Sequence, residues 1–337
     1  MTRSLLGLLS LCIQGLTGCG GHAVDLDHPA PAPSTSMGPD APVVFEGKVS
    51  GVWVDQQRLY WLFESDGYKT FLSCLKTDCE HTKLTYVKSL YGPNAVAVAA
   101  GHVYWTTYFG IFSCATEGCD KPLLITQDPE LRALFGHRDH VYWLSTFDLY
   151  RCQAGGCAET PEVVAPNMAV YRLAFDDTHV YWPGETGILS APSDGSEPAR
   201  LLIDLRSQET SSIESLAVGA GHLYWATSNG VYRCPIASCN TSAPTLLVNA
   251  VGPITAVKVD DSAVYWLEAD SVRSCPLSGC EQSTTLTPQV AGNNADDGSH
   301  FAVDADYVYW LEAADDTRDS PMPPALRRAK SIRRTAK

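Results

Sequence analysis

The chain has 337 residues, 45% of them apolar, and a formal net charge of −14 at pH 7. A surface this acidic repels phosphate backbones and anionic lipid headgroups, which argues against nucleic acid as a partner. The apolar content is sufficient for a large core, but no stretch reaches the roughly 20 apolar residues that a membrane-spanning helix needs.

Residues 1–18 have the order of an export signal, with a positive start followed by a short apolar stretch. This stretch ends in Leu-Thr-Gly-Cys at positions 16–19, which resembles the lipobox of bacterial lipoproteins. The resemblance implies a diacylglycerol on Cys19 and a mature chain that is anchored to a membrane without crossing it. Bacterial lipoproteins that stay in the inner membrane often have Asp after this Cys, so the resemblance with Gly20 there implies the outer membrane of the cell envelope, on its periplasmic or its surface face.

Residues 19–41 are rich in Pro, Gly, Ala, Ser and Thr. Such a composition cannot bury enough apolar surface to fold, and the prolines keep the backbone extended. We therefore expect a flexible linker between the lipid anchor and a folded domain that occupies residues 42–337.

The folded part is built on a repeated Tyr-Trp pair, which recurs seven times at intervals of 38 to 44 residues. A period near 40 with β-branched and aromatic residues is typical of the blades of a β-propeller. Neighbours on a strand face opposite sides, so an apolar pair indicates a strand that is buried on both faces. The pairs are Tyr60-Trp61, Tyr104-Trp105, Tyr142-Trp143, Tyr181-Trp182, Tyr224-Trp225, Tyr265-Trp266 and Tyr309-Trp310.

The fifth repeat, taken as the template, contains four short β-rich runs separated by turn residues, which we name strands A to D. The last repeat stops after a strand C at residues 331–334, whereas residues 42–46 look like a strand D without a blade of its own. We therefore predict an all-β, seven-bladed β-propeller with four antiparallel strands per blade. The N-terminal strand would complete the seventh blade, which removes the open sheet edges.

The Tyr-Trp repeat resembles the YWTD propellers of the lipoprotein-receptor type, which place this pair in strand B. The Asp of that signature is missing here, only Trp105 is followed by Thr, and those propellers have six blades. Over residues 43–337 the chain more closely resembles inferred lipoproteins of myxobacteria that combine Val-Tyr-Trp repeats with paired cysteines. That resemblance implies the fold and no particular activity.

Ten cysteines after Cys19 form five Cys-x4-Cys pairs in five different repeats. In the fourth repeat Ser190 and Gly195 occupy the aligned positions, and loss of both cysteines together is what a disulfide predicts. Disulfides in each C–D hairpin also suit an oxidising compartment. The alternative is a metal or redox site, although zinc needs four ligands and the pairs lie in separate blades. The predicted pairs are Cys74 with Cys79, Cys114 with Cys119, Cys152 with Cys157, Cys234 with Cys239, and Cys275 with Cys280.

Histidines recur two residues before the Tyr, and aspartates recur in the same A–B turns. We expect both to make turn contacts, because Asp caps its own backbone in turns. A ring of histidines or a Ca²⁺ site is the alternative, and the fragment Asp296-Asp297-Gly298 is too short for a calcium loop. No nucleophile, phosphate-loop or metalloprotease motif is present, so we assign no catalytic residue, metal or cofactor. The recurring histidines are His102, His140, His179 and His222.

Four aromatic residues in the B–C loops are not required by the repeat, namely Tyr68, Tyr108, Phe109 and Phe147. The B–C loops of the first and last blades, at 62–71 and 313–330, are expected to be longer than the others. Exposed aromatic side chains suit a protein, peptide or glycan partner. The sequence thus predicts a monomeric, non-enzymatic binding or scaffolding lipoprotein. The alternatives are an enzyme that acts on polysaccharide or peptidoglycan through carboxylates at the channel mouth, and a scaffold for outer-membrane assembly.

Overall fold

The computed structural model describes residues 43–128, 130–157, 160–168, 172–206, 212–287, 289–291, 299–314 and 329–337. All of them belong to one compact unit, Ser36–Lys337. The predicted export signal, Cys19, the predicted linker and the fragment Asp296-Asp297-Gly298 lie outside the described residues. Within the described ranges, no helix combines the length and the apolar character that are needed to cross a membrane.

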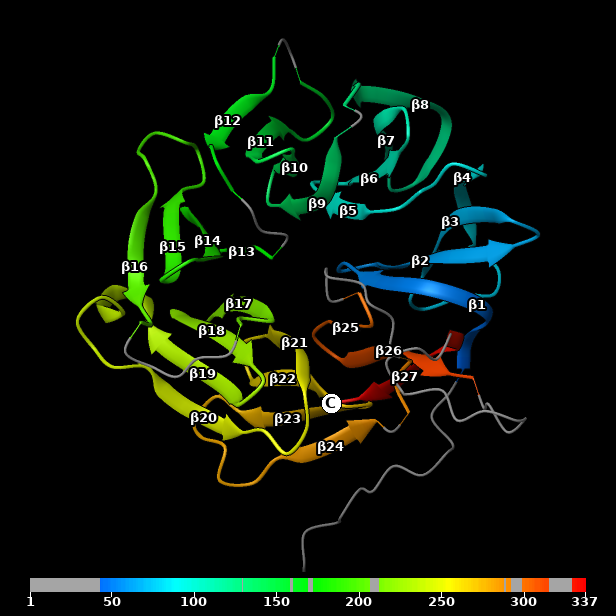
Figure 1. Cartoon of the computed structure of the whole chain (residues 1–337). Helices are drawn as coiled ribbons and strands as arrows, with labels where there is room; N and C mark the ends of the chain where they lie inside the picture. The colour runs from blue at the N-terminus through cyan, green and yellow to red at the C-terminus, as the bar shows by residue number, and fades with distance from the viewer. Residues whose placement is uncertain are drawn as a thin grey trace, which may run out of the picture. The chain divides into compact units, whose positions relative to one another are not determined.

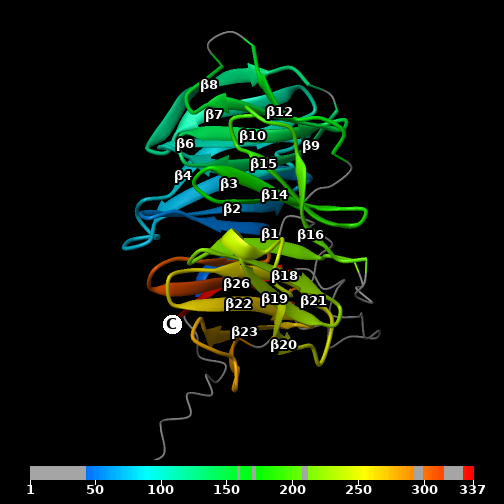
Figure 2. The same cartoon turned by 90° about the vertical axis from the view of Figure 1, so that its left-hand side faces the viewer.

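The chain folds into a ring of four-stranded antiparallel sheets, each with its first strand nearest the centre (Figure 1). Five of these blades are separate sheets, and the first and last blades share one sheet of seven strands. Seen from the side, strands of neighbouring blades run in layers one above another (Figure 2). This arrangement confirms the predicted seven-bladed propeller. Blade 2 consists of β5 (Val96–Ala99), β6 (His102–Thr107), β7 (Gly110–Ala115) and β8 (Gly118–Thr126), and blade 3 of β9 (Leu131–His137), β10 (His140–Ser145), β11 (Asp148–Gln153) and β12 (Glu162–Ala165).

The next three blades follow the same order from the centre outward. Blade 4 consists of β13 (Ala174–Phe175), β14 (His179–Gly184), β15 (Gly187–Pro192) and β16 (Arg200–Asp204). Blade 5 consists of β17 (Ser215–Gly219), β18 (His222–Thr227), β19 (Gly230–Pro235), the 3-10 helix η1 (Ile236–Ser238) and β20 (Thr245–Asn249). Blade 6 consists of β21 (Ile254–Val259), β22 (Ala263–Glu268), β23 (Ser271–Pro276) and β24 (Thr284–Thr287).

The strand β1 (Val43–Val54) closes the ring because it belongs to two blades. Its first part pairs with β27, where Phe45 lies opposite Ile332, and its second part pairs with β2, where Val52 lies opposite Trp61. The predicted closure is confirmed, although the two predicted segments form one strand that changes partner at Val49, which pairs with both Ala329 and Phe63. Gly47 has a φ of 142°, and a Cβ there would come within 2.6 Å of the Phe63 ring. Blade 1 continues with β2 (Arg58–Ser65), β3 (Tyr68–Leu75) and β4 (Leu84–Ser89), and blade 7 contains β25 (Phe301–Val303), β26 (Tyr307–Ala313) and β27 (Ala329–Ala336).

The two residues of each Tyr-Trp pair enter different interblade cores. Tyr60 of blade 1 packs in a cluster with Trp105 of blade 2, whereas Trp61 packs with Tyr309 of blade 7. In each of the seven clusters, the Tyr of one blade packs with the Trp of the next blade around the ring. All seven pairs are buried, as predicted, and each buried Trp stabilises the fold by about 2–3 kcal/mol relative to exposure.

Buried indole N–H groups ordinarily need hydrogen-bond partners. Trp266 donates to Glu268 over 3.3 Å, and Glu268 also accepts bonds from the backbone N–H groups of Val251 and Gly252. The expectation is wrong for Trp61, Trp225 and Trp310, whose buried Nε1 atoms have no partner among the described residues. Interblade packing therefore outweighs the cost of these unsatisfied donors.

The cysteines form the five predicted disulfides, with Cα atoms 4.8 to 5.4 Å apart. The first cysteine of each bridge lies in strand C and is buried, whereas the second is only half-buried in every bridge except that of blade 5. Each bridge therefore joins the buried strand C of its blade to the segment that follows it, which is the start of strand D in blade 2 and the C–D turn in the other four blades. The bridges are Cys74 to Cys79, Cys114 to Cys119, Cys152 to Cys157, Cys234 to Cys239, and Cys275 to Cys280.

The disulfides of the other blades also fix the alignment of blade 4, which has none. The first cysteine lies opposite the residue before Tyr in strand B, as Cys234 lies opposite Leu223. In blade 4 the residue in that place is Ala191, opposite Val180. The prediction of Ser190 and Gly195 is therefore wrong by one residue, and the aligned positions in blade 4 are Ala191 and Ser196.

Four A–B turns contain an aspartate that binds both its own turn and strand B. In blade 4, Asp176 accepts the backbone N–H groups of Thr178 and His179, and the Tyr181 hydroxyl donates to it over 2.5 Å. Asp55, Asp260 and Asp304 make the same contacts with Tyr60, Tyr265 and Tyr309. These contacts confirm the predicted capping role and join the turn to the repeated Tyr.

Candidate functional site

The B–C turns are tight two-residue hairpins in blades 1 to 6. In blade 1, Ser65 pairs with Tyr68 across Asp66-Gly67, and both turn residues have positive φ. The predicted long loop of blade 1 is therefore wrong, because strands β2 and β3 are extended up to an Asp-Gly turn that favours this conformation. Residues 315–328 of the last blade lie outside the described part. Side chains at such turns project beyond the sheet and have no neighbouring strand to cover them.

Blade 2 carries a group of exposed apolar side chains at this end of the ring. The turn residues Tyr108 and Phe109 are 72% and 61% exposed, and their ring centroids are 5.6 Å apart. In the D–A loop from blade 1, Tyr91 is 63% exposed, and its ring lies 6.2 Å from Phe109. Its neighbour Leu90 is also exposed. We call Leu90, Tyr91, Tyr108 and Phe109 the aromatic patch.

The two loops of the aromatic patch are held by backbone contacts. The N–H of Tyr108 donates to the carbonyl of Tyr91 over 3.3 Å, and the N–H of Asn94 donates to the carbonyl of Thr106 over 3.1 Å. The N–H of Phe109 donates to Thr107 Oγ1 over 3.0 Å. The exposed rings therefore stand on a fixed backbone, which reduces the conformational entropy lost when a partner binds.

The other two predicted binding residues do not join the patch through any described ring contact. Tyr68 lies under the Lys88 ammonium at 5.0 Å, and Phe147 lies under the Arg132 guanidinium at 5.2 Å. Each ring thus packs with a cation of its own blade. The sequence interpretation found two members of the patch and missed Leu90 and Tyr91, whose only signal is an apolar pair before Gly-Pro in a loop outside the repeat.

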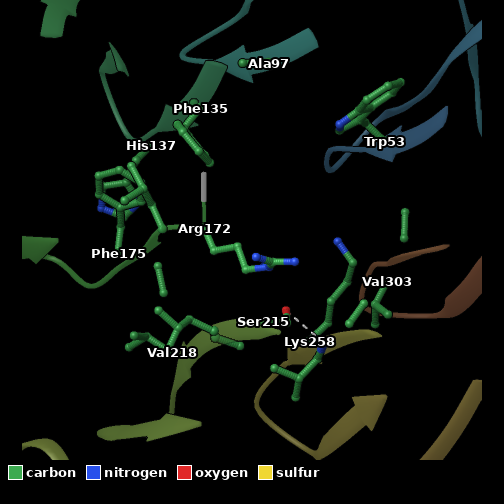
Figure 3. Close-up of a pocket in the computed structure, with 18 of the residues that line it drawn as sticks. Trp53, Ala97, Phe135, His137, Arg172, Phe175, Ser215, Val218, Lys258 and Val303 are labelled. Carbon is green, nitrogen blue, oxygen red and sulfur yellow. Dashed lines mark hydrogen bonds between the residues drawn. The ribbon is translucent and has the colours of Figure 1, made fainter. Parts of the chain in front are cut away.

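A central channel with a cavity of about 470 Å³ is lined by the innermost strands of the ring (Figure 3). Three charged side chains line the described part of this cavity, Arg172, Glu214 and Lys258. Arg172 Nη2 lies 3.3 Å from Glu214 Oε2. Trp53, on β1, faces the same space from the opposite side of the channel (Figure 3).

A histidine belongs to the channel wall as well. The His137 ring stacks on Phe175 with centroids 5.2 Å apart. Burial lowers the pKa of His137 below its usual value, so the ring is neutral at pH 7. A neutral, stacked ring contributes flat surface to the channel rather than charge.

The recurring histidines contact their own turns. His102 Nδ1 lies 3.1 Å from the Ala100 carbonyl oxygen, and His222 Nδ1 lies 2.8 Å from that of Ala220. His140 bonds Asp139, and His179 bonds Thr178. Across the described ranges, no group of three or more His, Cys, Asp or Glu side chains is arranged to hold a metal ion.

No known family profile matches the chain, and no curated protein matches it by sequence. Among solved structures it is similar to YCF48 bound to D1 peptide, with a TM-score of 0.60 and 10% identity over 92% of this chain and 98% of that one. It is similar to virginiamycin B lyase from Staphylococcus aureus, with a TM-score of 0.59 and 11% identity over 86% and 94% of the two chains. Apo AztD from Citrobacter koseri matches with a TM-score of 0.52 and 10% identity over 86% and 89%. At these identities the similarity supports the propeller fold alone.

Proposed function

We propose that the protein is a non-enzymatic binding lipoprotein of the bacterial cell envelope, which holds a protein or peptide partner on the aromatic patch. The observation that carries this proposal is the exposure of three neighbouring aromatic rings on a fixed backbone. Large aromatic side chains contribute most of the binding energy at many protein interfaces, and water-exposed groups of them mark interaction sites.

The patch is independent of the fold. The repeat needs only a two-residue turn between strands B and C, and the same positions hold Glu185-Thr186 in blade 4 and Ser228-Asn229 in blade 5. Two adjacent aromatic residues at Tyr108 and Phe109 are therefore not a requirement of the hairpin. A binding role accounts for them directly.

The envelope location rests on the sequence. The Leu-Thr-Gly-Cys motif would place a lipid on Cys19, and the Pro-rich residues 19–41 would link the anchor to the propeller. Five disulfides are consistent with an exported protein in an oxidising compartment. We propose the outer membrane as the site of anchoring and a monomer as the working state.

The enzymatic alternative requires a pair of carboxylates at the channel, as in glycoside hydrolysis. Glu214 is the one carboxylate among the described residues that line the cavity, and it is paired with Arg172. No observation favours the enzyme or the outer-membrane assembly scaffold over the binding protein.

The proposal can be tested by capture from detergent-solubilised envelopes with immobilised residues 36–337, the compact unit that contains the propeller. The double variant that combines Tyr108→Ser with Phe109→Ser should lose at least nine-tenths of the captured partner. A matched control is Leu123→Ser, since Leu123 is 51% exposed on the outer strand β8 of the same blade. Equal capture by both variants, or release of hydrolysed glycan by the wild-type protein, would overturn the proposal.

The anchor is tested separately by labelling cells with a palmitate analogue. The wild-type chain should incorporate the label and sediment with membranes, whereas Cys19→Ser should remain unlabelled. Label that persists in Cys19→Ser would contradict a lipid at this position.

A further inference from the structure

The ring of Phe109 stands nearly perpendicular to both tyrosine rings of the aromatic patch. The angle between the ring planes is 78° for Tyr91 and 88° for Tyr108, at centroid distances of 6.2 and 5.6 Å. Where two rings meet at nearly a right angle, the face of one and the edge of the other enclose a notch. The patch therefore offers two adjacent aromatic notches, one between Phe109 and each tyrosine.

Both tyrosines of the patch also carry a hydrogen-bond donor that the propeller does not use. Neither the Tyr91 hydroxyl nor the Tyr108 hydroxyl has a hydrogen-bond partner among the residues that the structure describes. The backbone N–H groups of Tyr91, Tyr108 and Phe109, in contrast, all donate within the two loops. A partner can therefore accept bonds from the two hydroxyls, but it cannot pair with these N–H groups as an added β-strand would.

The patch is small for a protein interface. Its three aromatic rings are each about two-thirds exposed, so at 150–250 Å² per buried aromatic side chain they offer roughly 400 Å² of surface. Stable complexes bury about 800 Å² on each partner. Because a small contact gains little free energy, the partner should lose little conformational entropy on binding and should be rigid beforehand.

We propose that the aromatic patch binds a proline-rich segment in the polyproline II conformation. This inference rests on the proposed binding function and names the chemistry of the partner. A polyproline II segment is formed before binding, and its carbonyl groups have no internal hydrogen bonds, so they can accept from Tyr91 and Tyr108. An α-helix, in contrast, uses its carbonyl groups in its own hydrogen bonds.

The spacing of the rings also suits such a segment. Polyproline II rises about 3.1 Å per residue, so two prolines that are two or three residues apart are separated by roughly 6–9 Å. Phe109 lies 6.2 Å from Tyr91 and 5.6 Å from Tyr108, centroid to centroid. One segment can therefore place a proline ring in the notch on each side of Phe109.

The direct test uses the full-length protein in detergent, with decaproline as the probe. Titration calorimetry should detect binding of decaproline at submillimolar concentration. A Gly-Ser peptide of equal length is flexible and should bind at least roughly tenfold more weakly, and so should a chitin hexasaccharide. No binding of decaproline, equal binding of the Gly-Ser peptide, or tighter binding of the saccharide would overturn the proposal.

Two sets of variants assign the binding to the patch. Tyr91→Phe combined with Tyr108→Phe keeps the rings and should weaken decaproline binding roughly tenfold, because two hydrogen bonds are lost. Tyr108→Ser combined with Phe109→Ser should abolish the binding. The matched control is Phe147→Ser, which removes an exposed ring from the same turn position in blade 3 and should bind as the wild type does. Wild-type affinity in either double variant would contradict the proposed contacts.

Competition separates this inference from the proposed function on which it rests. Saturating decaproline should release the partner that the wild-type protein captures from envelopes. Capture that depends on Tyr108 and Phe109 but persists in decaproline would overturn the proline-rich partner and leave the binding function intact. Capture that does not depend on these residues would instead contradict the binding function, and the calorimetric titration would still decide the chemistry of the patch.

Discussion

The A–B and C–D turns at one end of the ring repeat from blade to blade, whereas the B–C turns and D–A loops at the other end differ in every blade. The first set, which we call the repeated end, contains the Asp–Tyr hydrogen bonds of four blades and the disulfides of five. The second set, the variable end, contains the aromatic patch in blade 2 and polar turns in blades 4 and 5.

This difference indicates which end of the ring stabilises the fold. At the repeated end, side chains of the turns bond to the strands, so a substitution there disturbs a blade and its neighbour. Lys76 of blade 1 binds Asp304 of blade 7, and Lys337 of blade 7 binds Asp260 of blade 6, so this end also carries contacts between blades. At the variable end the side chains of the aromatic patch are exposed, and blades 4 and 5 have different residues in the same turn. Substitutions at the repeated end should therefore lower the stability of the fold, whereas substitutions at the variable end should weaken binding.

The largest expected effect is that of reducing the disulfides at the repeated end. Closing a loop this short stabilises a fold by about 2 kcal/mol through chain entropy. The five loops lie in different blades, so their contributions should nearly add, and the sum approaches the whole free energy of unfolding of an ordinary domain. In urea unfolding, the urea concentration at the midpoint should be much lower with dithiothreitol than without it. A midpoint that changes little would mean that the hairpins are held by packing alone.

A new disulfide in blade 4 should produce a smaller gain. Combining Ala191→Cys with Ser196→Cys places cysteines where the other blades have them and should raise the free energy of unfolding by up to about 2 kcal/mol. The control combines Ser190→Cys with Gly195→Cys, one residue earlier, where the first side chain points to the opposite face of the strand. Gly195 also has a φ of 69°, and a Cβ there would lie 2.8 Å from the Val163 carbonyl oxygen. Mass mapping and thermal melting compare the two, and bridging of the control pair alone would refute the register.

The fold could be predicted from the sequence because the Tyr-Trp pair occupies the same position of strand B in every blade. The Tyr-Trp spacing predicted the blade count and the double burial of strand B, and the missing last strand predicted closure by residues 42–46. Blade 4 was misaligned by one residue because it has no cysteine to mark the register, and Ser190 and Gly195 have the same spacing as a pair. The strand pairing of Val180 with Ala191 corrects it.

The candidate sites were harder to predict than the fold. Tyr108 and Phe109 stand out because they interrupt the repeat, but Leu90 and Tyr91 lie in a D–A loop, which has no repeated pattern for comparison. The channel side chains Trp53, Arg172 and Lys258 are far apart along the chain. Only the closed ring brings them together, so no local pattern could identify them.

A moderate effect is expected from the Asp–Tyr bonds as the pH falls. Burial alone would raise the pKa of Asp176, but the bonds from Tyr181, Thr178 and His179 outweigh it, so the pKa lies below its usual value. A carboxylate with a lowered pKa in the folded state stabilises above about pH 4 and loses that contribution as the pH falls toward its folded pKa. Tyr181→Phe should cost about 1–2 kcal/mol at pH 7 and flatten the decline of stability below pH 4.

The matched control for this pH dependence is Tyr142→Phe. Tyr142 belongs to blade 3, where its hydroxyl donates to the Ser193 carbonyl over 3.4 Å instead of to an aspartate. Urea midpoints between pH 3 and pH 7 should show an unchanged slope for this variant. An equal flattening in both variants would show that the Asp–Tyr bond is not the cause.

The smallest effect on stability is expected at the variable end. The double variant of Tyr108→Ser with Phe109→Ser removes two rings that are 72% and 61% exposed and leaves the backbone bond between Tyr108 and Tyr91 in place. Exposed substitutions away from caps and cores usually change the free energy of unfolding by less than about 0.5 kcal/mol. Urea unfolding should therefore give the wild-type midpoint for the variant that loses its partner in the capture experiment. If the variant instead lost about 2 kcal/mol or more, as core truncations do, the rings would belong to the fold. Blade 2, which carries the aromatic patch, would then contradict the distinction between a repeated end that stabilises the fold and a variable end that binds the partner.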